Sequence, residues 1–340
     1  MNSANLAKIC FRRHNGTLFL VLGHVGKEYF EYICVCFQNG RRPIRRKRND
    51  KSIIMKGTKG KNVALVLSSG SSRGLAHIGA IEALEERGYR ITSVAGCSIG
   101  SLVGGMYAAG KLPELKEFFL KMTTKRMLKY TDFSVSLNHL IKGERLENFF
   151  NEMIPDVTIE SLSLPLSIIA TDVTTGQEKV FREGVLSQLI RASISIPIVL
   201  RPVRYGDMLL MDGGVTNPLP LNRVQRNKGD LLVSVNVCAP IEPEKQVTKD
   251  VKSQKPHILE TLLERRQRLT QMNYLSIINR ITDIMVVQNV DLMKQLYPTD
   301  MSVEIGKNHF GSYDYDRAEE IIAYGHSLMS AEIDRFEGKV

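Results

Sequence analysis

A serine between two glycines is the side chain of this sequence best placed to act as a nucleophile. Residues 96–100 read Gly-Cys-Ser-Ile-Gly, a G-x-S-x-G pattern that separates an apolar, strand-like run from a helix-like run at 101–109. A strand–turn–helix of this kind exposes the central serine, and its neighbours must be small because strand and helix pass close together. We therefore interpret Ser98 as a candidate nucleophile, with Gly96 and Gly100 as elbow residues.

A loop of small residues upstream of the serine could stabilise negative charge. The apolar run 63–67 leads into Ser-Ser-Gly-Ser-Ser-Arg-Gly at 68–74, and a helical pattern follows at 75–84. Free backbone N–H groups near a helix N-terminus can bind a phosphate or the oxyanion of an acyl-transfer transition state. The loop contains neither G-x-x-x-x-G-K-[ST] nor G-x-G-x-x-G, the two glycine patterns that bind phosphate groups. We therefore favour the interpretation that it stabilises an oxyanion. The candidate residues of this loop are Gly70, Ser71, Ser72, Arg73 and Gly74.

An acidic residue completes the set of groups that could do chemistry. Asp212 closes the strand-like run 208–211 and is followed by two glycines and, at 217–218, by Asn-Pro. Taken alone, Asp-Gly indicates a turn. The position of this block after both the glycine-rich loop and the serine elbow makes Asp212 a candidate catalytic residue.

These blocks resemble the patatin-like phospholipases, in particular the small bacterial members. The resemblance covers residues 61–334, and five segments carry it: 69–74, 96–100, 170–176 (which includes Ala-Thr-Asp), 191–197 and 212–218. The main departure is in the loop, where the plant-type family has three consecutive glycines and this chain has Ser69, Gly70 and Ser71. Serine keeps the N–H donors but adopts positive φ less readily than glycine.

The resemblance implies a fold and a mechanism. The fold is a three-layer α/β/α sandwich with a mostly parallel central sheet. The activity is that of a patatin-like phospholipase or lipid acyl hydrolase, in which Ser98 attacks a lipid ester and Asp212 accepts its proton, through an acyl-enzyme. A carboxylate of ordinary pKa is a weak base for serine, so we expect Asp212 to be partly desolvated. For Arg73 we weigh two roles: it stabilises the loop through contacts with carbonyl groups, or it contacts an anionic head group of the substrate.

Two other functions stay open at this point. The chain order of α/β-hydrolases, Ser then Asp then His, could be met by a Ser-Asp-His triad. The histidines available after the aspartate are His257, His309 and His326. The fold could also serve as a non-catalytic lipid- or acyl-binding module.

The positive charge of the chain lies almost entirely in its first residues. The net charge of the whole chain is +10; residues 1–61 carry 14 basic and 3 acidic side chains, while the remainder carries 32 basic and 33 acidic ones. We therefore divide the chain into a basic N-terminal extension at 1–60, disordered or the result of a start upstream of Met55, and a patatin-like hydrolase domain at 61–340. The run at 41–48 also fits contact with an anionic membrane. We expect no nucleic-acid partner.

The remaining features set expectations about surroundings and substrate. The longest early apolar run, 17–23, is far shorter than the roughly 20 residues of a membrane-spanning helix. Five cysteines with no ligand spacing indicate neither a disulfide framework nor a metal site. We expect a cytoplasmic protein, with peripheral contact at the inner membrane surface left open, that needs no cofactor. The helical, Met-containing stretch 258–296 is the candidate lid. Acyl chain, head group and oligomeric state stay undetermined.

Overall fold

The computed structural model describes residues 8–14, 17–23, 33–37, 61–123, 143–240 and 274–339. The chain divides into two units, Met1–Gly57 and Thr58–Val340.

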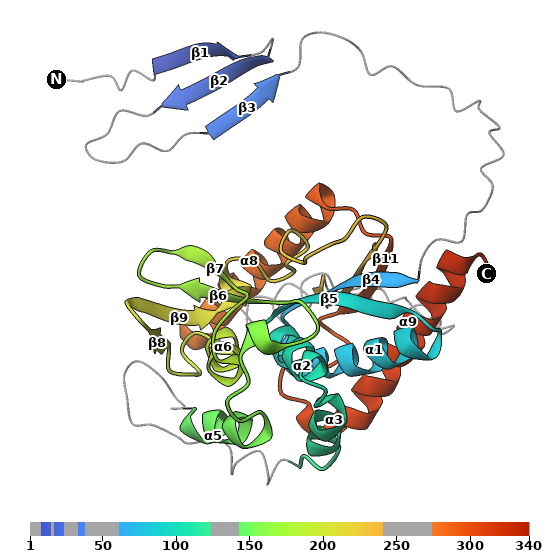
Figure 1. Ribbon diagram of the computed structural model, residues 1–340. Helices are drawn as coiled ribbons and strands as arrows, with labels where there is room; N and C mark the ends of the chain where they lie inside the picture. Colours follow the sequence, from blue (N-terminus) through green and yellow to red (C-terminus); the bar gives the residue numbers. More distant parts are fainter. Residues whose placement is uncertain are drawn as a thin grey trace, which may run out of the picture. The chain divides into compact units, whose positions relative to one another are not determined.

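The first unit contains a small antiparallel sheet in the order β1-β2-β3 (Figure 1). Its strands are β1 (Lys8–His14), β2 (Thr17–Gly23) and β3 (Ile33–Phe37). These strands lie within the extension at 1–60, for which we expected either disorder or a start upstream of Met55. β2 and β3 are rich in Ile, Val, Leu and Phe, and β1 contributes Ile9 and Phe11, whereas the charge run at 41–48 follows all three strands.

A mostly parallel sheet forms the centre of the second unit, as predicted. Its strand order is β11-β10-β4-β5-β6-β9-β8, and β7 also pairs with β6. The parallel strands are β4 (Asn62–Leu67), β5 (Arg90–Cys97), β6 (Leu166–Asp172), β10 (Leu231–Ala239) and β11 (Met301–Gly306). The antiparallel strands are β7 (Gln177–Phe181), β8 (Val203–Tyr205) and β9 (Met208–Asp212).

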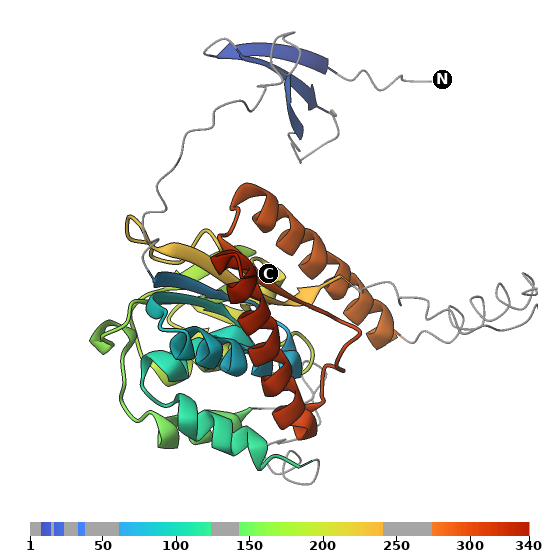
Figure 2. The same ribbon diagram turned by 90° about the vertical axis from the view of Figure 1, so that its right-hand side faces the viewer.

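Helices cover both faces of this sheet, which gives the predicted three layers (Figure 2). Alternate residues of β4 point to opposite faces, so Leu65 and Leu67 join the larger core whereas Val66 joins a smaller one with Val286 and Val290. The smaller core packs under α8 (Tyr274–Leu296). The larger core packs under the other helices: α1 (Ala76–Glu86), α2 (Ile99–Ala108), α3 (Leu112–Leu120), α5 (Glu144–Met153), α6 (Leu186–Ser193) and α9 (Ala318–Glu337).

The candidate lid is only partly described. Its second half is helical, as predicted, and forms α8, whereas residues 258–273 lie outside the described residues. Met293 packs against the smaller core, but Met285 is 47% exposed and Met272 is outside the described range. Within the part of the chain that the structure describes, no helix is both long and apolar enough to cross a membrane.

Candidate active site

Strand register brings the three candidate segments to one edge of the sheet. Leu67 at the end of β4 pairs with Gly96 of β5, and the next residue of β5, Cys97, pairs with Ile169 of β6. One residue further along β6, Ala170 pairs with Asp212 of β9. The glycine-rich loop, the serine elbow and the aspartate therefore begin at adjacent strand ends, where ligands bind in open α/β sheets.

Ser98 occupies a strained turn between β5 and α2. Its φ of 54° and ψ of −123° are unusual for a residue with a side chain. The flanking glycines permit this turn: a Cβ on Gly96 would lie 2.3 Å from the carbonyl oxygen of Gly100, and one on Gly100 would lie 2.3 Å from that of Leu67. This geometry fits the elbow expected from the sequence.

The hydroxyl of Ser98 is hydrogen-bonded directly to Asp212. Ser98 Oγ donates to Asp212 Oδ2 at 2.5 Å, and the backbone N–H of Gly214 donates to the other carboxylate oxygen at 2.7 Å. Both side chains are buried, with 5% and 6% of their surface exposed. Burial raises the pKa of Asp212 to about 6, against the lowering effect of these two hydrogen bonds. The carboxylate is thus partly desolvated, as a base for serine requires.

Neighbouring hydroxyl groups hold this pair in place. Ser193 Oγ accepts the backbone N–H of Ser98 at 2.9 Å. Thr171 Oγ1 donates to the carbonyl oxygen of Asp212 at 3.0 Å, and the N–H of Asp212 donates to the carbonyl of Ser195 at 3.0 Å. Sequence reasoning assigned none of these three positioning roles. The only signal was the family resemblance of segments 170–176 and 191–197.

The glycine-rich loop presents two backbone donors. Gly70 has a φ of 155°, and a Cβ there would lie 2.2 Å from Val237 Cγ2. Ser71 has a φ of 56°, so serine does adopt the left-handed conformation here. Within the described residues the N–H groups of Gly70 and Ser71 have no protein acceptor, whereas that of Ser72 donates to the carbonyl of Ser312 at 3.4 Å. Of the three donors expected, two are therefore available.

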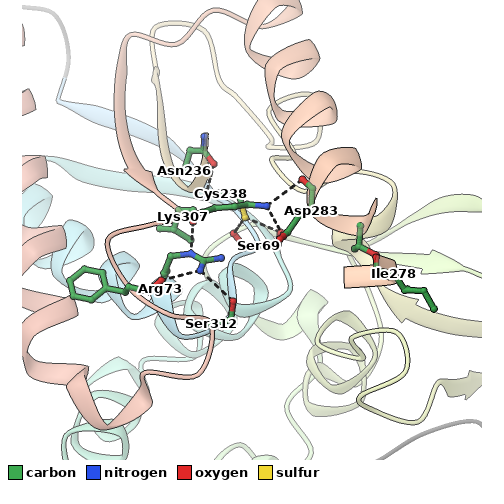
Figure 3. A network of polar contacts seen from close by, with 11 residues as sticks. Ser69, Arg73, Asn236, Cys238, Ile278, Asp283, Lys307 and Ser312 are labelled. Carbon is green, nitrogen blue, oxygen red and sulfur yellow. Dashed lines mark hydrogen bonds and ion pairs between the residues drawn. The ribbon is translucent and has the colours of Figure 1, made fainter. Parts of the chain in front are cut away.

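Arg73 and Gly74 fix the loop from behind. Arg73 is buried, and its guanidinium donates to the carbonyl oxygens of Val237 at 3.0 Å and Phe310 at 3.2 Å and to Ser312 Oγ at 3.4 Å (Figure 3). Of the two roles considered for Arg73, the structure shows carbonyl contacts, which join the loop to Val237 of β10 and to Phe310 between β11 and α9. A Cβ on Gly74 would lie 2.2 Å from Ile99 Cγ2, so the loop packs directly on the start of α2.

His77 and Cys238 support the same loop. His77 is buried, and its Nε2 lies 2.9 Å from the carbonyl oxygen of Ser68. Burial lowers the pKa of His77 to about 4, so the ring is neutral at physiological pH. Cys238 Sγ donates to the carbonyl of Ser69 at 2.8 Å (Figure 3). Cys97, next to the nucleophile, is fully buried, and burial raises the pKa of its thiol, which fits a packing role in the elbow.

The described histidines lie outside the Ser98–Asp212 pair. His326 Nε2 is 2.8 Å from Glu86 Oε2, and the ring of His309 stacks on Tyr324 with centroids 5.3 Å apart. Neither histidine is hydrogen-bonded to Ser98 or Asp212. His257 lies outside the described residues. Among the described residues, Ser98 and Asp212 are therefore bonded to each other with no histidine joined to the pair. Within these same residues, no three His, Cys, Asp or Glu side chains are grouped as metal ligands.

Comparisons with known proteins agree with the sequence resemblance. Residues 65–224 match the family model described as patatin-like phospholipase. An uncharacterized NTE family protein of Mycobacterium tuberculosis is 30% identical over 342 residues, which cover 84% of this chain and 95% of that protein. Human patatin-like phospholipase domain-containing protein 6 is 30% identical over 56% of this chain and 14% of its own length.

A solved structure shows a weaker similarity. The crystal structure of VipD from Legionella pneumophila aligns with a TM-score of 0.43 at 11% identity, over 98% of this chain and 71% of that one.

Proposed function

This chain belongs to the patatin-like phospholipase family and is a lipid hydrolase, and we propose that it cleaves lipid carboxylic esters with Ser98 as nucleophile and Asp212 as general base. The hydrogen bond of 2.5 Å between Ser98 Oγ and Asp212 Oδ2 carries this proposal. It joins a hydroxyl in an elbow to a buried carboxylate whose pKa is about 6. At neutral pH that carboxylate is largely ionised, yet it is more basic than an ordinary aspartate.

The proposed reaction has two halves. Ser98 Oγ attacks the ester carbonyl and its proton passes to Asp212 Oδ2. The N–H groups of Gly70 and Ser71, together with the N-terminal end of α2, stabilise the tetrahedral oxyanion. The intermediate expels the alcohol, which takes the proton from Asp212, and the acyl group stays on Ser98. Water, deprotonated by Asp212, then attacks the acyl-enzyme; the acid leaves and Ser98 recovers its proton.

We further propose that α8 contacts the lipid surface from which the substrate is taken. Ile277, Ile278, Ile281, Ile284 and Met285 are all exposed by more than a third, and their helical spacing places them along one stretch of α8. The same helix contacts the 3₁₀ turn that directly follows Asp212. An apolar surface beside the site would bring an acyl chain to Ser98 and lower the cost of extracting the lipid.

Ester hydrolysis with matched variants tests the enzymatic proposal. The purified chain should hydrolyse a p-nitrophenyl ester and a phospholipid in the presence of EDTA, and Ser98→Ala should reduce both rates to background. Ser234→Ala, at a buried serine of β10 whose hydroxyl lies 3.0 Å from that of Ser302, is the matched control. A chain that binds vesicles but cleaves neither substrate would instead be a non-catalytic lipid-binding module.

A further inference from the structure

A segment far from the glycine-rich loop in sequence holds that loop through a ladder of side-chain hydrogen bonds. Three consecutive loop side chains donate to three consecutive backbone carbonyls in the connection between β11 and α9. The two segments run antiparallel: as the residue number rises by one in the loop, the number of its partner in the connection falls by one. The pairs are Ser71 Oγ with Ser312 O at 2.5 Å, Ser72 Oγ with Gly311 O at 2.7 Å, and Arg73 Nη1 with Phe310 O at 3.2 Å.

The ladder explains how a serine stays in a conformation that favours glycine. Ser71 has a φ of 56°, which costs a residue with a side chain of the order of 1 kcal/mol. Its hydroxyl donates to the carbonyl of Ser312 and lies 3.3 Å from the hydroxyl of Tyr315. Because the Ser71 proton is used by Ser312, Tyr315 is the donor of the second bond. These two bonds are absent if residue 71 is glycine.

The connection is itself held by an internal turn and by contacts with two other elements. Asp314 accepts the N–H of Gly311 at 2.8 Å, which closes a tight turn. The ring of Tyr315 stacks on Phe119 of α3 with centroids 5.8 Å apart. Lys307 Nζ lies 2.7 Å from Asp283 Oδ1 of α8, an ion pair visible in Figure 3. The ladder is thus anchored on α3 and α8, the helix that carries the exposed isoleucines.

We infer that Tyr315 is a positioning residue of the oxyanion hole, acting through the hydroxyl of Ser71 on the backbone N–H groups of Gly70 and Ser71. The inference rests on the proposed role of that loop in ester hydrolysis. In physical terms, the N–H groups stabilise the transition state only if they are held before the reaction begins. In this chain, hydrogen bonds between side chains of the loop and the connection hold the N–H groups in place, whereas a flexible glycine at position 71 would not fix them.

A double-mutant cycle tests this coupling in the full chain. Tyr315→Phe removes the hydroxyl and keeps the ring on Phe119; Ser71→Gly removes the acceptor and permits positive φ. Tyr315→Phe should lower kcat on a soluble ester about fivefold, as the loss of one neutral hydrogen bond implies, with KM within twofold. In the Ser71→Gly background the same change should have no further effect. Tyr313→Phe, at an exposed tyrosine two residues away, is the control and should keep full activity.

Hydrogen exchange gives a readout that does not depend on catalysis. Tyr315→Phe should increase deuterium uptake in the peptide covering residues 69–74 more than in peptides of the central sheet, while the free energy of unfolding falls by no more than one hydrogen bond contributes. Independent, multiplicative effects of the two substitutions on kcat, or unchanged exchange in residues 69–74, would overturn the inference. If even the wild type fails to hydrolyse esters, the proposed function fails, whereas the exchange result still decides whether Tyr315 holds the loop.

Discussion

At the scale of single residues, the proposed ester hydrolysis depends on one desolvated carboxylate. Asp212 is buried, and its two oxygens are used by Ser98 and by the N–H of Gly214. Desolvation raises its pKa and the two bonds limit the rise, which leaves a value of about 6. A base of this strength needs no histidine to work at neutral pH, since its ionised form predominates there.

The pH dependence of activity should therefore report Asp212. Below pH 6 the protonated carboxyl cannot accept the Ser98 proton, so kcat/KM on a soluble ester should rise with pH and reach a plateau above about pH 7. The apparent pKa should be about 6. Initial rates in buffers of constant ionic strength from pH 4 to 9 measure it. A profile that is flat between pH 5 and 8 would contradict the assignment.

The same raised pKa should destabilise the folded chain above pH 6. The pKa of Asp212 in the folded chain, about 6, is higher than the ordinary aspartate pKa of 3.8, so the stabilising contribution is complete below pH 4 and is lost as pH rises through 6. Asp212→Asn should thus be inactive but gain about 2–3 kcal/mol of unfolding free energy over the wild type between pH 4 and pH 8. Urea denaturation at both pH values measures this. Asp207→Asn, at an exposed aspartate, should show little change; an equal gain there would contradict the explanation.

The sequence alone indicated the candidate reacting groups, but not the groups that hold them. Ser98 and Asp212 sit in short patterns whose glycines are required by local backbone geometry, and such patterns are visible in one sequence. The bond from Ser71 to Ser312 joins residues 241 positions apart, and no local pattern indicates it. Likewise, the role of Ser193 depends on how α6 packs on β6, which only the fold determines.

At the scale of elements, helix α1 crosses helix α9 at very short range. A Cβ on Gly325 would lie 2.1 Å from the carbonyl oxygen of Ala76, and one on Gly79 would lie 2.0 Å from that of Ile322. The α1 helix directly follows the glycine-rich loop, so this crossing also fixes the direction in which the loop leaves the sheet. On the other face, α8 combines a buried side with exposed isoleucines.

The glycine at the crossing should be intolerant of a single methyl group. Gly325→Ala should lower the free energy of unfolding by about 2 kcal/mol, because the helices must separate to admit the Cβ. Chemical denaturation measures the loss. Ala323→Ser, at an exposed position of the same helix, is the control. Equal stability of Gly325→Ala and the wild type would show that the helices are not in contact as described.

The exposed apolar surface of α8 should matter only for substrate in a lipid surface. The double variant Ile281→Asp/Ile284→Asp should lose at least tenfold in hydrolysis of vesicle phospholipid, since an isoleucine that moves from water into lipid contributes about 1.5–3 kcal/mol. Hydrolysis of a soluble ester should fall less than twofold. Ala323→Asp, which adds a charge at an exposed site of α9, outside this surface, is the matched control. Parallel losses on both substrates would argue for misfolding instead of lost lipid contact.

At the scale of the whole molecule, charge and catalysis lie in different parts of the chain. The excess of basic residues is confined to residues 1–61, whereas every residue of the proposed site belongs to the unit Thr58–Val340. The first strand of that unit begins at Asn62.

Removal of residues 1–54 should therefore preserve catalysis. The truncated chain should hydrolyse a soluble ester within twofold of the full chain and unfold at the same urea concentration, because the deleted residues all belong to the first unit and the sheet of the second unit begins at Asn62. Steady-state rates and urea unfolding of both chains provide the measurement. Aggregation or loss of esterase activity on truncation would show that the first unit is needed by the second.

The central claim, a catalytic Ser98–Asp212 dyad, is tested most directly by the rate of covalent labelling with a fluorophosphonate. The wild type should gain one adduct, located on Ser98 by peptide mass spectrometry, and Ser98→Ala should gain none. Asp212→Asn should be labelled at least 100-fold more slowly, whereas His309→Ala/His326→Ala should react within threefold of the wild type. An adduct that persists in Ser98→Ala, or a histidine variant as slow as Asp212→Asn, would contradict the dyad.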